Sequence, residues 1–476
     1  MLETILPIVF TAAPFVIAIL LGLAGPIGIF VMYRVAHKWN DTTKLLIILW
    51  SICFGEVSHV VLTKRSLDLA HELTWVVYDD VAGSFWASRL ITLFLVGFSF
   101  AEIMRCWGVL RKTRVRDPAT SIAIAFLAYL LGIALVGAVG ATQPEFSYKI
   151  LYVPIVLLAM YYFTHLDMAR FTLHLKLILL VPALGSLIAA VVAPDFAVLR
   201  PYDGVPGLSF RLFGVTGHAN ALGPIGLLLM LLELYFPSRR WLRWIILPSA
   251  FVAFVLAQSK TAWVIAVVQF LLVFIPYNTS ILQSRAGRNK STLLPVVFSL
   301  TLLAVTAVAI LSHGLGDSLL EDKGLTNLTG RTLIWDLTLK EFYQNPVFGY
   351  GPGMWGLEYR WKLNMMYVGQ AHNQFINTLG KSGLLGLMLL LVYLVVLFKY
   401  ALKYFKQSRG LILAIFILIL GRCITEAPLE VSSILDWAFF TQALAVIFAA
   451  HYARAEMVPI ENTVNNKPLA IDWKTS

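Results

Sequence analysis

The chain has 476 residues, of which 59% are hydrophobic and only 13% are charged, and its mean hydropathy is +0.79. Soluble domains usually carry about 25% charged residues, so the composition excludes an ordinary soluble protein. The net charge of +11 does not indicate a nucleic-acid-binding protein, because the basic residues lie in short loops between apolar runs, where they act as orientation signals. The three cysteines have no spacing typical of a metal site or a disulfide framework.

Apolar runs recur along the whole chain, and runs of about 18 residues or more are candidates for transmembrane helices. The sequence therefore predicts an all-α, polytopic integral membrane protein with about 12–14 transmembrane helices, and a single transmembrane domain over residues 1–476. The first run, at 5–33, contains Gly25-Pro26 and forms either one span or two. The runs lie at roughly 5–33, 43–62, 86–104, 119–141, 148–163, 171–193, 218–236, 242–257, 260–277, 293–311, 383–404, 410–424 and 434–452.

Lysine and arginine gather in alternate loops, for example at 111–116, 239–243 and 399–409. Cytoplasmic loops carry such an excess of basic residues, so these loops are expected in the cytoplasm, together with a disordered tail at 455–476. The alternate loops then face outward. They lie at about 63–85, 194–217, 312–382 and 425–433.

The outward loop at 312–382 is far longer than a typical connection, and long loops on a rigid scaffold often carry function. We expect a helix in it that ends at Asn345-Pro346, because proline cannot continue a helix. Gly349–Gly353 then forms a turn-rich loop, and Asn373 caps a short helix running to Gly380. On the first helix, one face holds Arg331, Trp335, Thr338 and Phe342 and another holds Leu333, Ile334 and Leu337.

Four polar clusters meet on the outer face by topology alone. Three fixed cations and a histidine on one face suggest an anionic substrate such as a phosphate or pyrophosphate, and the histidine could act as a general base. The clusters are Arg211 with His218 and Asn220, then Lys260 in Gln258–Trp263, then Arg331, and last His372 with Asn373.

Each of these residues also has a purely structural interpretation. Lys260 and Arg331 could anchor helix ends at lipid headgroups, and Trp335 could belong to the interfacial aromatic belt. His218 and Asn220 could serve only in capping and packing, and a lone histidine at a membrane edge is more often a satisfied polar residue than a catalyst.

Ionisable residues inside the predicted spans either pair within the helix bundle or line a path through it. A path of this kind would be expected in a transporter, which is the main competing class of function. The residues are Glu56, Glu102, Glu233, Arg422 and Asp436.

Together, the order of the motifs resembles the bacterial O-antigen ligase and O-antigen/exopolysaccharide polymerase family. The resemblance extends over about residues 200 to 400. The matching residues are Gly217-His218-Ala219-Asn220, Ser259-Lys260-Thr261-Ala262, Leu328–Trp335, Asn345–Gly351 and Ala371-His372-Asn373.

The resemblance implies a GT-C-like, metal-independent glycosyltransferase without a cofactor, in the bacterial inner membrane with its site facing the periplasm. Its donor would be a glycan on undecaprenyl pyrophosphate, and its acceptor a second lipid-linked glycan or the lipid A core. Lys260 and Arg331 would hold the pyrophosphate, with Arg211 as a further cation, and His372 would activate the acceptor hydroxyl. His218, Asn220, Asn373 and Trp335 would support the site.

The chemistry of such a transfer agrees with these residue types. Cations stabilise the charge that develops on the departing pyrophosphate, and a base helps a sugar hydroxyl to attack the anomeric carbon directly. Asp317, Glu321 and Asp322 are alternative acidic residues early in the loop. The Ser-Lys-Thr turn and the Leu-Thr-Gly-Arg-Thr motif favour a polymerase, with a ligase as the alternative.

Overall fold

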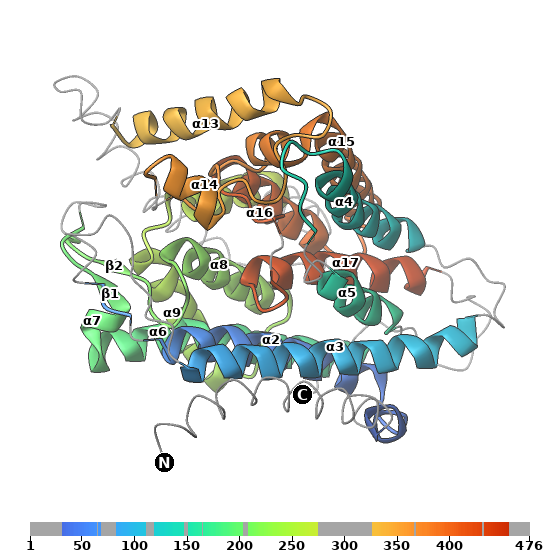
Figure 1. The fold of residues 1–476 in the computed structure, drawn as a ribbon. Helices are drawn as coiled ribbons and strands as arrows, with labels where there is room; N and C mark the ends of the chain where they lie inside the picture. The colour runs from blue at the N-terminus through green and yellow to red at the C-terminus, as the bar shows by residue number, and fades with distance from the viewer. Residues whose placement is uncertain are drawn as a thin grey trace, which may run out of the picture.

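The computed structural model describes residues 31–63, 65–67, 82–110, 119–146, 151–163, 165–202, 208–274, 326–365, 368–430 and 433–456. Within them the chain is almost entirely helical (Figure 1). The helices are α2 (Asp41–Val61), α3 (Ala82–Leu110), α4 (Thr120–Val139), α5 (Tyr152–Tyr162), α6 (Met168–Val192), α7 (Pro194–Ala197), α8 (Ala219–Tyr235), α9 (Arg240–Leu256), α10 (Lys260–Gln269) followed by the π-helix Phe270–Phe274, α13 (Thr326–Gln344), α14 (Leu357–Lys362), α15 (Gln374–Lys403), α16 (Leu411–Thr425) and α17 (Trp437–Ala455).

Every predicted apolar run that falls on described residues coincides with a helix. Five described helices are long and apolar enough to cross a membrane: α2, α3, α4, α6 and α15. Shorter apolar helices include α5, α8 and α16. The prediction of an all-α polytopic membrane protein is therefore confirmed. The predicted number of spans remains a prediction, because the runs at 5–33 (up to residue 30) and 293–311, like most of the tail at 455–476, lie outside the described residues.

The centre of the bundle is α17, which crosses the middle of the view in Figure 1. It packs against α16, α5, α15 and α2. A helix surrounded on all sides needs an apolar surface all round, and α17 meets this need with a run of buried residues from Trp437 to Ala450. Phe439, Phe440 and Phe448 are each 0% exposed.

Two of the in-span carboxylates are paired inside the bundle. Glu102 accepts hydrogen bonds from Lys44 at 2.9 Å and from Arg105 at 2.8 Å. Glu233 accepts from Lys176 at 3.0 Å and from the Ser238 hydroxyl at 2.7 Å. Buried charges persist in proteins when they are paired and hydrogen-bonded, so these two carboxylates have a structural role.

Two short strands were not predicted. Val198–Leu199 (β1) pairs antiparallel with Arg211–Leu212 (β2), with Leu199 opposite Arg211. The strands are only two residues long, so they have too little alternation to be recognised in the sequence. The pairing holds the segment before α8 against the end of α7 and fixes the position of Arg211.

The predicted helix in the loop at 312–382 is present as α13, and burial is not confined to one of its two predicted faces. Ile334 and Thr338 are 4% and 0% exposed, whereas Leu333 is 50% exposed. Thr338 is buried because it lies against Gly380 of α15, where a Cβ would come within 2.4 Å of Thr338 Cγ2. Packing of α13 on α15 therefore decides which residues are buried (Figure 1).

The Gly349–Gly353 loop has the predicted role of backbone geometry. Gly349 has φ +73° and Gly351 has φ +122°, and the Tyr350 amide donates to the Gly380 carbonyl at 2.8 Å. The loop packs where α15 is broken at Gly383, which has φ +59° and ψ −158°. The predicted short helix to Gly380 and the predicted span from 383 are thus two parts of one broken helix.

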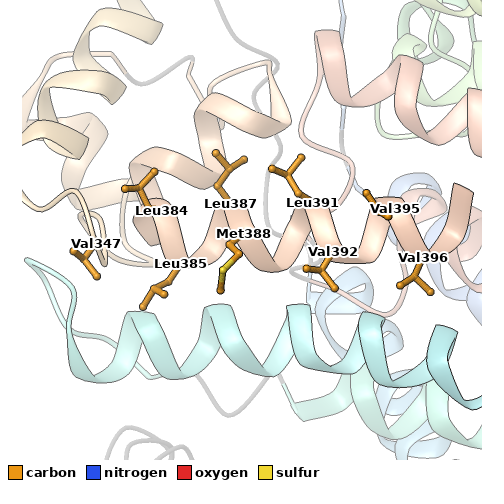
Figure 2. A pocket seen from close by; sticks show the side chains of 9 residues that line it. All are labelled: Val347, Leu384, Leu385, Leu387, Met388, Leu391, Val392, Val395 and Val396. Carbon is orange, nitrogen blue, oxygen red and sulfur yellow. The ribbon is translucent and has the colours of Figure 1, made fainter. Parts of the chain in front are cut away.

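An apolar groove of about 750 Å³ runs along α15 beside α4. In Figure 2, Leu385, Met388, Val392 and Val396 point towards α4, and Leu384, Leu387, Leu391 and Val395 lie on the other side of the helix. Val347, from the loop after α13, completes the lining. Such a surface suits the hydrocarbon chains that surround a membrane-spanning helix.

We predict that Gly349→Ala destabilises the protein by about 2–4 kcal/mol, because a Cβ at positive φ is strained and overpacking adds to that strain. The new Cβ would lie 2.7 Å from Gly380 O and from the Gly383 and Ser382 amide nitrogens. The measurement is thermal unfolding of the detergent-purified protein. The control is Gly83→Ala, since a Cβ at Gly83 meets nothing within 4 Å. Equal melting temperatures for the two variants would contradict the prediction.

Candidate functional site

His372 and Glu426 form a hydrogen-bonded pair at the end of the bundle where α15 begins and α16 ends. His372 Nδ1 lies 3.1 Å from Glu426 Oε2, although the residues are 54 positions apart in the sequence. An ionised carboxylate can only accept, so Nδ1 carries the hydrogen. In the neutral ring the other nitrogen, Nε2, has the lone pair that a general base requires.

Glu426 is a buried carboxylate, 8% exposed, with two further side-chain donors. Asn220 Nδ2 donates to Oε1 at 2.7 Å, and Gln370 Nε2 donates to Oε2 at 2.7 Å. Burial alone would raise the pKa of Glu426. The hydrogen bond from His372 and the charges of His372, His218 and Arg422 outweigh burial and lower that pKa. Glu426 is therefore an anion at neutral pH.

Arg211 lies behind Asn220 in the same chain of hydrogen bonds. Its Nη2 donates to Asn220 Oδ1 at 2.6 Å, and its Nε donates to the Ala257 carbonyl at 3.0 Å. The guanidinium also lies over the Tyr202 ring, 5.1 Å from its centroid. Since Arg211 occupies the oxygen of the Asn220 amide, the amide nitrogen must face Glu426.

His218 caps α8, as its position suggested. Its Nδ1 accepts the Asn220 backbone hydrogen at 3.0 Å, so the proton of the neutral ring lies on Nε2. Part of the side chain stays exposed, yet loss of water around the rest of the ring and the nearby Arg211 charge lower the pKa of His218 to about 4. His218 is therefore neutral at pH 7 and could donate through Nε2.

Lys260 is the first residue of α10 and is exposed. Among the described residues, no carboxylate or other side chain forms a hydrogen bond or ion pair with it. Its neighbour Thr261 donates to the Thr425 hydroxyl at 2.8 Å, which ties the start of α10 to the residue before Glu426. An unpaired ammonium at a helix N-terminus gives a site where both the charge and the backbone amides attract anions.

Arg331 lies on α13, one turn before Trp335. Within the described part of the chain it likewise has no hydrogen bond or ion pair. Trp335 Nε1 donates to the Ala371 carbonyl at 2.8 Å, so α13 is fastened to the residue next to His372. Arg331 therefore lies on the helix that is hydrogen-bonded to the residue before His372.

The backbone at His372 is held from several sides. Asn373 caps α15 through hydrogen bonds from the amides of Phe375 and Ile376, and its Nδ2 donates to the Ile424 carbonyl. The Ala371 amide donates to Asn377 Oδ1 at 3.1 Å. His372 has φ +49°, a conformation that costs a non-glycine residue energy and persists only when the surroundings impose it.

The structure thus brings His372, Asn373, Asn220, Arg211 and His218 into one hydrogen-bonded region. Lys260 is tied to it through Thr261 and Thr425, and Arg331 through Trp335 and Ala371.

Sequence reasoning missed Glu426 and Gln370. Glu426 follows a span directly in Thr425-Glu426-Ala427-Pro428, so an acidic residue at the outer end of a span was the available signal. Arg422, an ionisable residue inside a predicted span, lies one turn before Glu426, and its charge helps to lower the pKa of Glu426.

Residues 244–391 match the family model Wzy_C, described as O-antigen ligase. The match confirms the resemblance found in the sequence, and it covers less than half of the chain. It includes Lys260, Arg331 and His372 but neither the α8 start nor Glu426. No curated protein matches the chain.

We predict that Glu426→Gln lowers thermal stability at pH 7, by about 1–3 kcal/mol, because the new amide turns a donor towards a donor. The folded-state pKa of Glu426 is below the ordinary value of about 4.3. The carboxylate therefore stabilises the fold above that pH, and this contribution disappears as the pH falls through the lower folded-state pKa. Melting temperatures from pH 8 to pH 3 should show the two proteins converging at acid pH.

The matched control is Glu358→Gln, which removes an exposed carboxylate that pairs with Lys362. Its melting temperature should follow that of the wild type at every pH. A pH-independent difference between Glu426→Gln and the wild type would contradict the assignment of Glu426 as the stabilising anion.

Proposed function

We propose, on the premise that residues 244–391 are an O-antigen ligase family segment, that this protein is a glycosyltransferase working at the periplasmic face of the bacterial inner membrane. It moves a glycan from undecaprenyl pyrophosphate to a sugar hydroxyl of an acceptor. The observation that carries the proposal is the His372–Glu426 pair, with two unpaired cations on the elements joined to it.

In this proposal, His372 is the general base. As the acceptor oxygen attacks the anomeric carbon, its proton passes to His372 Nε2. The bond between the anomeric carbon and the pyrophosphate oxygen breaks, and its electron pair stays on the pyrophosphate. Glu426 remains ionised and stabilises the imidazolium that forms, as the carboxylate does in other carboxylate–histidine pairs.

Lys260 and Arg331 are proposed to bind the pyrophosphate of the donor, where their charge counts most as the leaving group departs. Both are free of ion pairs among the described residues. Arg211 adds positive charge from behind Asn220, and His218 offers its Nε2 hydrogen. Asn373 and Trp335 support the site by fixing the backbone on either side of His372.

We propose a polymerase of lipid-linked repeat units first, and a ligase that uses the lipid A core as the alternative. The Ser259-Lys260-Thr261 turn favours the polymerase, and the name of the matching family favours the ligase. A transporter of the same lipid-linked glycan has less support, because Glu102 and Glu233, which could have lined a path, are held in ion pairs.

The first test is His372→Ala. Loss of a general base should lower the transfer rate by about 10²–10⁴-fold, while the protein remains folded and inserted in the membrane. The assay uses purified protein and a lipid-linked oligosaccharide, with and without lipid A core. Longer lipid-linked chains identify a polymerase, and glycan on lipid A identifies a ligase. Near-normal turnover by the variant would exclude His372 as the base.

A second test separates charge from geometry at Lys260. Lys260→Met should lower kcat/KM for the donor by about 10–100-fold, the range of a lost charge-assisted hydrogen bond. Lys260→Arg keeps the charge and should retain most of the activity. Lys340→Met, on the exposed side of α13, is the matched control and should behave as the wild type. A Lys260→Met protein with unchanged donor kinetics would remove Lys260 from the site.

A further inference from the structure

Glu426 can only orient His372 if the carboxylate is itself held in place. On one side Asn220 fixes Oε1, and Arg211 fixes the direction of the Asn220 amide. On the other side the donor is Gln370, two residues before His372. Gln370 lies just outside the matching motif Ala371-His372-Asn373.

Gln370 makes two hydrogen bonds to adjacent residues of the facing segment. Its Nε2 donates to Glu426 Oε2 at 2.7 Å, and its Oε1 accepts the Ala427 backbone hydrogen at 2.8 Å. One amide therefore holds both the end of the Glu426 side chain and the backbone next to it. The residues joined by these two hydrogen bonds are 56 and 57 positions apart in the sequence. The contact therefore joins the loop that contains His372 to the end of α16.

The double contact needs a side chain with a donor and an acceptor at this length. Alanine would leave the Ala427 amide without its acceptor and Glu426 Oε2 without its second donor. Glutamate would place one carboxylate against another and could restore the pattern only when protonated, since a carboxylic acid has one O–H donor and a carbonyl acceptor. These alternatives make the role of the amide testable.

We propose that Gln370 is a positioning residue for glycan transfer: it holds Glu426 in the place where the carboxylate orients His372. The proposal rests on the function proposed above. Gln370 donates to Glu426 rather than to His372, so its loss should lower kcat and leave the KM for the lipid-linked oligosaccharide nearly unchanged. A catalytic group needs support of this kind to hold its geometry.

The test compares Gln370→Ala and Gln370→Glu with Gln374 variants as matched controls. Gln374 is 1% exposed, and its Oε1 accepts the Leu429 backbone hydrogen at 2.7 Å, so it bridges to the same loop. Its Nε2 donates to the hydroxyls of Tyr129 and Thr378 rather than to Glu426. Kinetic constants are measured for folded, monodisperse protein, with a lipid-linked oligosaccharide as both donor and acceptor probe. Changes in folding yield then do not enter kcat.

Gln370→Ala should lower kcat by about tenfold or more at every pH, the loss expected when a catalytic group is held less rigidly. For Gln370→Glu, the ratio of its kcat to that of the wild type should rise by about tenfold as the pH falls from about 8.5 to 6, because two adjacent carboxylates share a proton. A flat ratio, an unchanged kcat for Gln370→Ala, or the same rise in Gln374→Glu would overturn the proposal.

A second measurement does not depend on transfer. Diethyl pyrocarbonate labels the neutral nitrogen of a histidine, and mass spectrometry gives the labelling rate at His372. A well-placed Glu426 makes Nε2 more nucleophilic, so labelling should be severalfold slower in Gln370→Ala and unchanged in Gln374→Ala. Equal rates in the wild type and Gln370→Ala would overturn the positioning role even if the wild type transfers glycan. A wild type without transfer activity, but with the labelling difference, would overturn the proposed function alone.

Discussion

The arrangement of the segments around His372 depends on one buried anion. A carboxylate that is almost fully removed from water is costly unless several donors replace the water. Glu426 receives hydrogen bonds from Asn220, Gln370 and His372, which come from the start of α8 and from the loop before α15. The need to satisfy this charge therefore brings together segments that the chain separates by more than two hundred residues in one case.

The cations of this region differ in how far protein groups already occupy their hydrogen-bond donors. Arg211 is engaged by Asn220, by the Ala257 carbonyl and by the Tyr202 ring, so much of its hydrogen-bonding capacity serves the protein. Lys260 and Arg331 are not engaged in this way by described residues. Two cations without an ion pair among the described residues add positive charge to the elements joined to the His372 segment, and positive charge attracts anions.

The sequence was sufficient for the features that depend on local pattern. The apolar runs predicted the helices, and Asn373 was recognised as a cap because its capping bonds go to the amides of Phe375 and Ile376. The assignment of an outer face from the basic loops stays a prediction. The residues that act at a distance were harder. Glu426 and Gln370 meet across 56 positions, and neither lies in a pattern that a single sequence can reveal. Thr338 is buried because Gly380 faces it, and helical spacing could not have shown this. The two-residue strands and the break at Gly383 also depend on tertiary contacts.

The family match covers only part of the hydrogen-bonded region around His372. Residues 244–391 carry Lys260, Arg331, Gln370 and His372, whereas Asn220 lies before the matched segment and Glu426 lies after it. The segment is therefore not a portable module. A chimera that moved this segment into another membrane protein would take His372 without Glu426 and Asn220, so the three stretches of chain have to be exchanged together.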